Sequence, residues 1–224
     1  MCGICGTLNF SREDHVDAQD VQRMNDAIFH RGPDQDGFYI KDNVGLAMRR
    51  LSIIDLSTGK QPIRNEDGSV WIVFNGEIYN YPELRKELES RGHRFYTKSD
   101  TEAIVHAYEE FGAECPSKLN GMFAFAIWDD YRQRLFIARD RLGKKPLYYY
   151  HDGKRVIFGS ELKSILQIKD VPRRVSREAL DLYLTYEYIP APHTIFEDIY
   201  KLPAGHSLTI HANGKVEVRP YWEL

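Results

Sequence analysis

The sequence predicts an α+β domain built on two antiparallel sheets. Its strand-like and helix-like segments are segregated along the chain, which favours layered sheets and helices over a doubly wound parallel sheet. Turn signals typical of hairpins, Asp152-Gly153 and Asn213-Gly214, lie beside strand-like segments in the second half. With 224 residues, 42% of them hydrophobic and 28% charged, the chain has an ordinary globular composition.

The first half of the chain begins with a strand expected from Cys2 to Phe10. A helix is expected from Val21 to Phe29, where apolar residues recur at the helical period, and Arg31-Gly32-Pro33-Asp34 breaks it. Buried strands are expected from Val44 to Leu56 and from Val70 to Phe74, because β-branched and apolar residues run together there. An Asn-Glu-Asp-Gly sequence between them is typical of a turn.

Two helices follow these strands. The first has Pro82 in its opening turn and ends at Gly92, the usual places of these residues at helix ends. The second begins at Ser99-Asp100-Thr101-Glu102, a capping-box pattern. The remaining expected strands are Met122–Trp128, Leu135–Ala138, Leu147–Tyr150 and Val156–Phe158, with helical segments at Glu161–Leu166 and Arg177–Tyr186 and a last hairpin turning at Asn213-Gly214.

Charge and cysteine content exclude several classes of function. A net charge of -3 and a pI near 6.2, with lysine and arginine spread along the chain, argue against a nucleic-acid partner. The apolar stretches are far shorter than the roughly 20 residues of a membrane span, and no secretory signal follows Met1. Three cysteines cannot form a fully paired disulfide framework, so we expect a cytoplasmic protein.

Cys2 is the residue that points to chemistry. A small residue after the initiator methionine allows Met1 to be removed, which leaves a thiol and a free α-amine on the same residue. Because the amine titrates at roughly 7.7 to 8 and the thiol at roughly 8.5, the amine can accept the thiol proton near neutral pH. Two other interpretations remain at this point: a small buried residue, or a C-x-x-C pair with Cys5.

A family resemblance rests on six motifs that occur along the chain in a fixed order. They are Met1-Cys2-Gly3-Ile4-Cys5-Gly6, His30-Arg31-Gly32-Pro33-Asp34, Arg50-Leu51-Ser52-Ile53-Ile54-Asp55, Phe74-Asn75-Gly76-Glu77-Ile78-Tyr79-Asn80, Ser99-Asp100-Thr101-Glu102 and Phe123-Ala124-Phe125-Ala126-Ile127-Trp128-Asp129. Together they resemble the class II glutamine amidotransferase domain of the glutamine-hydrolysing asparagine synthetases. The resemblance continues to at least Gly159–Lys163, and Leu202–His206 is also similar. It implies the four-layer αββα sandwich of the N-terminal nucleophile hydrolases.

The resemblance implies a reaction and an oxyanion hole. Cys2 would attack the side-chain carbonyl of L-glutamine and form a γ-glutamyl thioester. The side-chain amide of Asn75 and the backbone N–H of Gly76 would stabilise the oxyanion, each contributing roughly 3 to 4 kcal/mol. The competing interpretation of Asn75-Gly76 is an ordinary hairpin turn.

The resemblance also implies how the substrate is held. Arg50 would grip the α-carboxylate, and Asp100 would bind the α-ammonium with Gly76 and Glu77 nearby. Main-chain groups of the strand that continues from Arg50 would border the substrate, and the residues concerned are Leu51, Ser52, Ile53 and Ile54. The simpler alternatives are a surface arginine and an acidic residue that favours a helix N-terminus. We expect His30 to be scaffold.

The resemblance divides the chain and places its partners. Residues 1–212 would form the glutaminase domain, and residues 213–224 would be a terminal hairpin strand leading toward a synthetase domain absent from this chain. No cofactor or metal is expected here, whereas ATP and Mg²⁺ would belong to the synthetase domain, and a homodimer is left open. Relatives that amidate a sugar, a phosphoribosyl or a cell-envelope acceptor remain an alternative, as does a silent binding domain.

Overall fold

In a computed structural model of the protein, which describes residues 1–51 and 59–224, the strands form two six-stranded antiparallel sheets. The first sheet has the order β10-β8-β9-β1-β3-β2 and the second β12-β11-β7-β6-β5-β4. The strands are β1 (Gly3–Asn9), β2 (Gln35–Lys41), β3 (Val44–Arg50), β4 (Ile63–Arg64), β5 (Val70–Ile78), β6 (Gly121–Asp129), β7 (Arg134–Arg139), β8 (Tyr148–His151), β9 (Arg155–Gly159), β10 (Ile199–Lys201), β11 (His206–His211) and β12 (Val216–Pro220).

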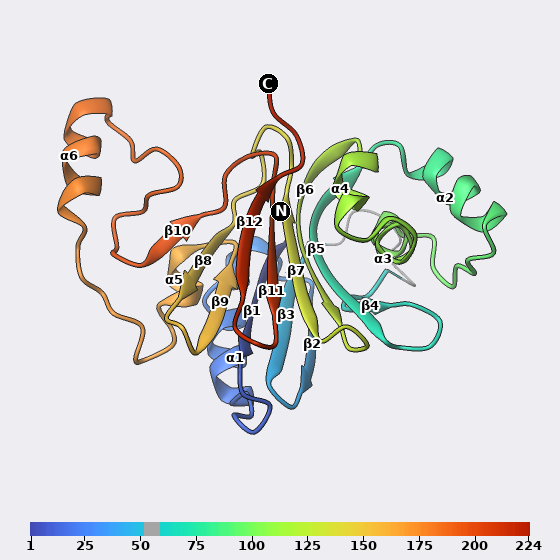
Figure 1. Cartoon of the computed structure of the whole chain (residues 1–224), viewed down its shortest axis with the longest axis horizontal. Helices are drawn as coiled ribbons and strands as arrows, with labels where there is room; N and C mark the ends of the chain where they lie inside the picture. The colour runs from blue at the N-terminus through green and yellow to red at the C-terminus, as the bar shows by residue number, and fades with distance from the viewer. Residues whose placement is uncertain (52–58) are drawn as a thin grey trace.

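Helices cover the outer faces of the two sheets (Figure 1). They are α1 (Ala18–Asp26), α2 (Tyr81–Ser90), α3 (Asp100–Phe111), α4 (Cys115–Lys118), α5 (Leu162–Ile165) and α6 (Arg177–Tyr186), with short 3-10 turns at Phe29–Arg31 and Gly112–Glu114. Among the described residues, no helix combines the length and apolar character that a membrane crossing requires.

Three apolar clusters separate four layers. Between the sheets, Ile4 of β1 packs in one cluster with Val73 of β5. A second cluster joins Tyr108 of α3 to the far face of the second sheet, and a third joins Met24 of α1 to the far face of the first. The layers therefore run helix, sheet, sheet, helix, which confirms the predicted αββα sandwich.

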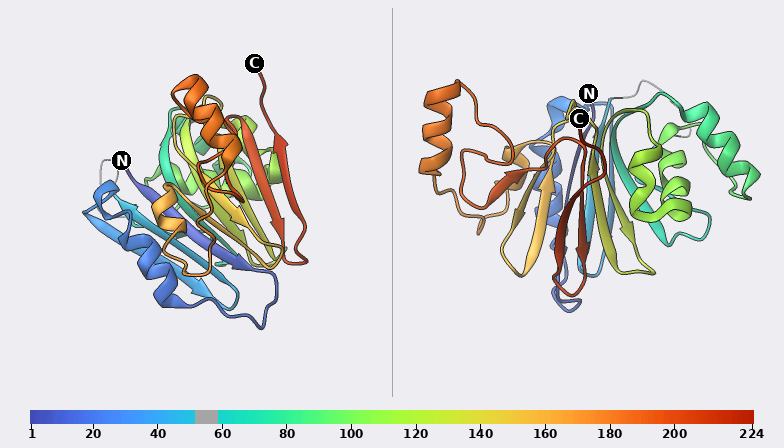
Figure 2. Two further views of the ribbon diagram at one scale, coloured as in Figure 1. Left: turned by 90° about the vertical axis from the view of Figure 1, so that its left-hand side faces the viewer. Right: turned by 45° about the horizontal axis from the view of Figure 1, so that its top comes forward.

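Helix α6 lies outside this layered body. Its bounds are those predicted, but Ala179 is its only buried residue. The right-hand view of Figure 2 shows the helix set apart from the two sheets at the edge of the molecule. Its apolar side chains consequently face solvent, and Leu184 is 72% exposed.

The expected buried strands and hairpins are confirmed, with shifts at their ends. Strand β5 continues past the predicted end at Phe74 to Ile78. Strand β3 ends at Arg50, whereas the strand predicted from Val44 continued to Leu56, and part of that prediction lies outside the described residues. Helix α1 begins earlier than predicted because Asp17 caps it by accepting the N–H of Gln19 at 2.8 Å. Strands β2, β4 and β10 were not predicted.

The predicted capping box at α3 is half correct. Ser99 caps the helix and accepts the N–H of Thr101 at 3.2 Å. Glu102 does not complete the box, because its carboxylate accepts the N–H groups of Tyr96 and Thr97, each at 2.7 Å. Glu102 therefore holds the loop that leads into the helix.

Candidate active site

One pocket of about 150 Å³ gathers most of the predicted site residues. It lies where the start of β1 meets the ends of β3 and β5 and the first turn of α3. Of the predicted residues, its lining includes Cys2, Arg50, Leu51, Asn75, Gly76, Glu77 and Asp100. The other three, Ser52, Ile53 and Ile54, lie outside the described residues.

Cys2 precedes β1 and is held from two sides. Its thiol donates to the carbonyl oxygen of Leu51 with a sulfur–oxygen distance of 3.7 Å. Its own carbonyl oxygen accepts from Nε of Arg31 at 2.9 Å, and Nη1 of Arg31 bonds to Glu161 at 3.0 Å. Arg31 therefore fixes the main chain beside the thiol, a role that the sequence did not predict.

Cys5 has a different environment, which removes the paired-cysteine interpretation. It packs among the helices on the outer face of the first sheet, whereas Cys2 packs against the cluster between the sheets. Complete burial raises the pKa of Cys5 to about 12, so its thiol stays protonated. Both cysteines are free.

Asn75 and Gly76 lie inside β5 rather than in a turn, so the hairpin-turn interpretation is wrong. They pair with Ala124 and Phe123 of β6. A Cβ atom at position 76 would overlap the carbonyl oxygen of Met122, so only glycine fits this close approach. Asn75 is 1% exposed, and within the described part of the chain neither its amide nitrogen nor its amide oxygen has a hydrogen-bond partner.

Asp100 is the first residue of α3 and is 7% exposed. Oδ2 accepts the N–H of Ile78 at 2.9 Å, which ties the helix to the end of β5. Burial is the largest cause of a raised pKa for Asp100, and the charge of Glu77 adds to it. A cation bound beside Asp100 would stabilise its ionised form.

Arg50 is the last residue of β3 and is 5% exposed, which rules out the surface-arginine interpretation. Its Nη1 donates to Oε1 of Gln35 at 2.9 Å. The backbone of Gly32 packs so closely here that a Cβ atom would overlap the backbone of Arg49. The His30–Asp34 motif thus supports the arginine, and His30 itself bonds to Glu161 at 2.9 Å.

Two further pocket residues were missed by the sequence. Lys145, in the loop after β7, is 6% exposed, and its Nζ lies 3.6 Å from the sulfur of Met1. Burial lowers the pKa of Lys145 against an opposing effect of Cys2. Gln61 accepts the N–H of Phe74 at 2.7 Å and so fixes β5 just before Asn75. Neither has a local pattern that distinguishes it from a surface residue, since only the fold brings it to the pocket.

A family model for the glutamine amidotransferase domain matches residues 1–222. Asparagine synthetase [glutamine-hydrolyzing] 1 of Bacillus subtilis is 42% identical over 225 residues, covering 100% of this chain and 35% of that protein. A putative asparagine synthetase [glutamine-hydrolyzing] 2 of Methanocaldococcus jannaschii is 40% identical over 247 residues, covering 100% of this chain and 47% of that protein. The chain thus spans between a third and a half of the length of these relatives.

Solved structures agree on the fold. The glutamine phosphoribosylpyrophosphate amidotransferase of Bacillus subtilis, in complex with ADP and GMP, superimposes with a TM-score of 0.70 at 19% identity. The match covers 99% of this chain and 49% of that one, and it bears on the fold alone. With the family match over nearly its whole length, the chain belongs to the glutamine amidotransferase domain family.

Proposed function

We propose that this chain hydrolyses L-glutamine to glutamate and ammonia, with Cys2 as the nucleophile once Met1 has been removed. The observation that carries the proposal is a single pocket in which a thiol, an unpartnered buried amide and a buried carboxylate come together. A buried amide without a partner costs roughly 1 to 3 kcal/mol per group, and a reacting carbonyl oxygen would supply the missing partner.

Opposite charges in the pocket suit the two ends of an amino acid. Arg50 is proposed to hold the α-carboxylate, because a guanidinium fork matches that group bidentately. Asp100 is proposed to hold the α-ammonium, with Glu77 adding negative charge. Main-chain groups of Leu51, and of the residues that follow it, would border the substrate.

The proposed reaction uses the α-amine of Cys2 as the base. The amine takes the thiol proton, the thiolate forms a bond to the side-chain carbonyl carbon, and the negative charge moves to the oxygen. Asn75 and the N–H of Gly76 stabilise that oxyanion until the carbon–nitrogen bond breaks and the amine returns its proton to the leaving ammonia. Water, activated by the same amine, then releases glutamate.

In a longer enzyme the ammonia is proposed to serve the synthesis of asparagine from aspartate and ATP. Support comes from the names of the relatives and from the share of their length that this chain covers. Residues 1–212 would form the glutaminase unit and residues 213–224 would lead toward a second domain, which would hold ATP and Mg²⁺. Exposed Leu180, Tyr183 and Leu184 on α6 offer an apolar surface for a contact with it. A sugar or cell-envelope acceptor is the alternative.

The proposal includes a reducing, cytoplasmic location, since the thiol has to stay free. The test is glutamate release by the processed chain, measured beside Cys2→Ala and the control Cys5→Ala. Cys2→Ala should release no glutamate and still bind glutamine in a calorimeter, whereas Cys5→Ala should lose activity only through packing. Turnover by Cys2→Ala would refute the assignment of the nucleophile.

A further inference from the structure

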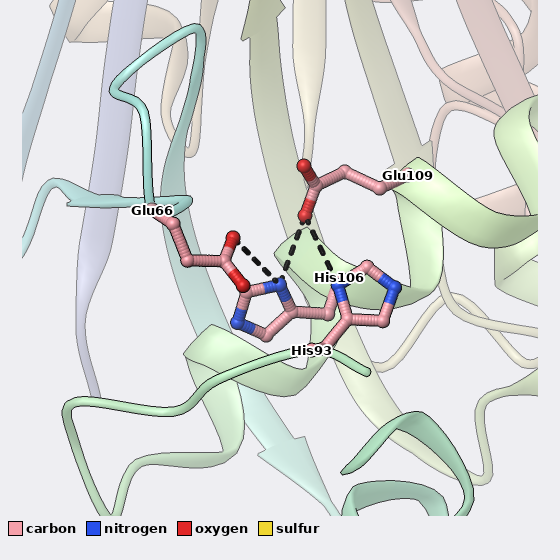
Figure 3. Close-up of side chains that lie close together, drawn as sticks. All are labelled: Glu66, His93, His106 and Glu109. Atoms are coloured by element: carbon pink, nitrogen blue, oxygen red, sulfur yellow. Dashed lines mark hydrogen bonds and ion pairs between the residues drawn. The ribbon is translucent and has the colours of Figure 1, made fainter. Parts of the chain in front are cut away.

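Away from the pocket, four ionisable side chains converge beside α3 (Figure 3). Glu66 comes from the loop between β4 and β5, and His93 from the loop between α2 and α3. His106 and Glu109 lie one turn apart on α3 and so share a face of the helix. One nitrogen or oxygen atom from each residue lies within 4.8 Å of the others. Three separate segments therefore meet at this cluster.

Both imidazole rings turn Nδ1 toward the centre of the cluster. Nδ1 of His106 lies 2.9 Å from Oε2 of Glu109 and 3.8 Å from Oε2 of Glu66. Nδ1 of His93 lies 3.6 Å from the same oxygen of Glu109. In Figure 3 the carboxylate of Glu109 points at both rings. Four ligand atoms thus surround one point.

The outward nitrogens of the two rings have a second set of carboxylates. Nε2 of His93 lies 3.1 Å from Glu110, within hydrogen-bond distance, whereas Nε2 of His106 lies 3.6 Å from Glu102, an ion-pair distance without a hydrogen bond. A carboxylate on the far nitrogen is the usual outer partner of a histidine that binds a metal, because it fixes the ring and leaves the other nitrogen free to coordinate. Glu102 is fully buried and is itself fixed by two backbone N–H groups.

Charge also favours a cation at this point. Glu66 and Glu109 bring two negative charges to the cluster, and a divalent ion bound by deprotonated imidazoles would balance them. Burial alone would lower the pKa of His106, but the carboxylates of Glu102 and Glu109 raise it to about 9. A proton on His106 is accordingly the competitor of the ion, and metal binding would displace it.

We propose that Glu66, His93, His106 and Glu109 form a zinc site with two nitrogen and two oxygen ligands. Zinc bonds of about 2.0 to 2.2 Å in a tetrahedron place the ligand atoms roughly 3.3 to 3.6 Å apart. The distances of 2.9, 3.6 and 3.8 Å around Glu109 and His106 bracket that value, and all four ligand atoms lie within 4.8 Å of one another, so side-chain rotations would close the cluster to a tetrahedron. The ion would tie both loops to α3, the helix that begins with Asp100, and its role is structural.

The test measures Zn²⁺ binding to the whole chain after chelator treatment. It is made in a Cys2→Ala background, because a free thiol is itself a zinc ligand. Calorimetry should give one ion per chain, and His93→Gln or Glu109→Gln should weaken binding by about 100-fold or more. The matched control is His193→Gln, whose ring lies 3.9 Å from Glu178 outside the cluster, and it should bind like the parent.

A second readout does not depend on these affinities. Zn²⁺ should raise the unfolding temperature of the parent and of His193→Gln but not that of His93→Gln, and Co²⁺ should give the visible absorption of a four-coordinate site. If His93→Gln or Glu109→Gln fails to fold, Glu66→Gln replaces it, because the Glu66 side chain is 40% exposed and its substitution disturbs the fold less. The proposal is overturned if Zn²⁺ does not bind one to one, or if the ligand variants bind it as tightly as His193→Gln does. The four side chains would then form a cluster of ion pairs held together by a proton.

Discussion

Replacing Asn75 with alanine should separate stability from catalysis. The side chain is buried, and neither amide atom has a partner in the described parts of the chain. Each such group costs roughly 1 to 3 kcal/mol, so its removal offsets the packing that the truncation loses. Since the residue borders the pocket, the change enlarges an existing space. We expect the free energy of unfolding of Asn75→Ala to be within about 1 kcal/mol of the parent, or higher.

Asn65 is the matched control, because it is also buried but fully bonded. Its Nδ2 donates to Ser69 at 3.1 Å and to Glu109 at 2.7 Å, and its Oδ1 accepts the N–H of Val70 at 3.0 Å. Substitution of Asn65 by alanine leaves the buried N–H of Val70 without its acceptor. Asn65→Ala should therefore lose roughly 2 to 3 kcal/mol or more of stability.

The assay combines urea denaturation with steady-state kinetics of glutamate release. Asn75→Ala should lower kcat by about 100- to 1,000-fold, which corresponds to about 2.7 to 4 kcal/mol for one oxyanion donor. A fall in stability as large as that of Asn65→Ala would mean that the Asn75 amide has a structural partner. A loss of less than about tenfold in kcat would remove Asn75 from the oxyanion hole.

Three further predictions concern the substrate clamp and the nucleophile. Arg50→Lys should raise KM far more than it lowers kcat, because an ammonium cannot form the bidentate pair; a change confined to kcat would contradict this role. Since burial raises the Asp100 pKa above its ordinary 3.8 and substrate binding needs the ionised form, the affinity of Cys2→Ala for glutamine, measured by calorimetry, should fall as pH drops through that raised pKa. An affinity that stays constant down to pH 3.8 would refute it. Chains that keep Met1 should release almost no glutamate, because the Cys2 nitrogen is then a peptide N–H without a usable lone pair; intact mass spectrometry beside the assay checks this.

The sequence predicted the centre of the fold better than its margins. Central strands such as β6 carry continuous apolar runs, whereas the strands that were missed lie at sheet edges. Only Gly37 of β2 is fully buried, and β4 and β10 are two and three residues long. Edge strands have a weak hydrophobic pattern because neighbours cover them on one side only.

The pocket residues also fall into those that the sequence predicted and those that it did not. Cys2, Arg50 and Asp100 stand in motifs whose order carried the resemblance, and the structure brings them together. Arg31 acts through Glu161, a residue 130 positions away, and Lys145 reaches the pocket from a loop. Contacts of this kind depend on how the two sheets stack, and no local period or turn signal encodes them.

The hydrogen bond from Arg31 to the Cys2 carbonyl oxygen fixes the main chain directly after Met1, which bears on the removal of that methionine. The first strand pair joins Gly3 to Arg49, and Met1 has no pairing in the sheet, with 62% of its surface exposed. The strand register of β1 is therefore compatible with a leading methionine. On the proposed mechanism the unprocessed chain is an inactive precursor with a complete scaffold and a blocked base, and an aminopeptidase that removes the exposed Met1 would activate it.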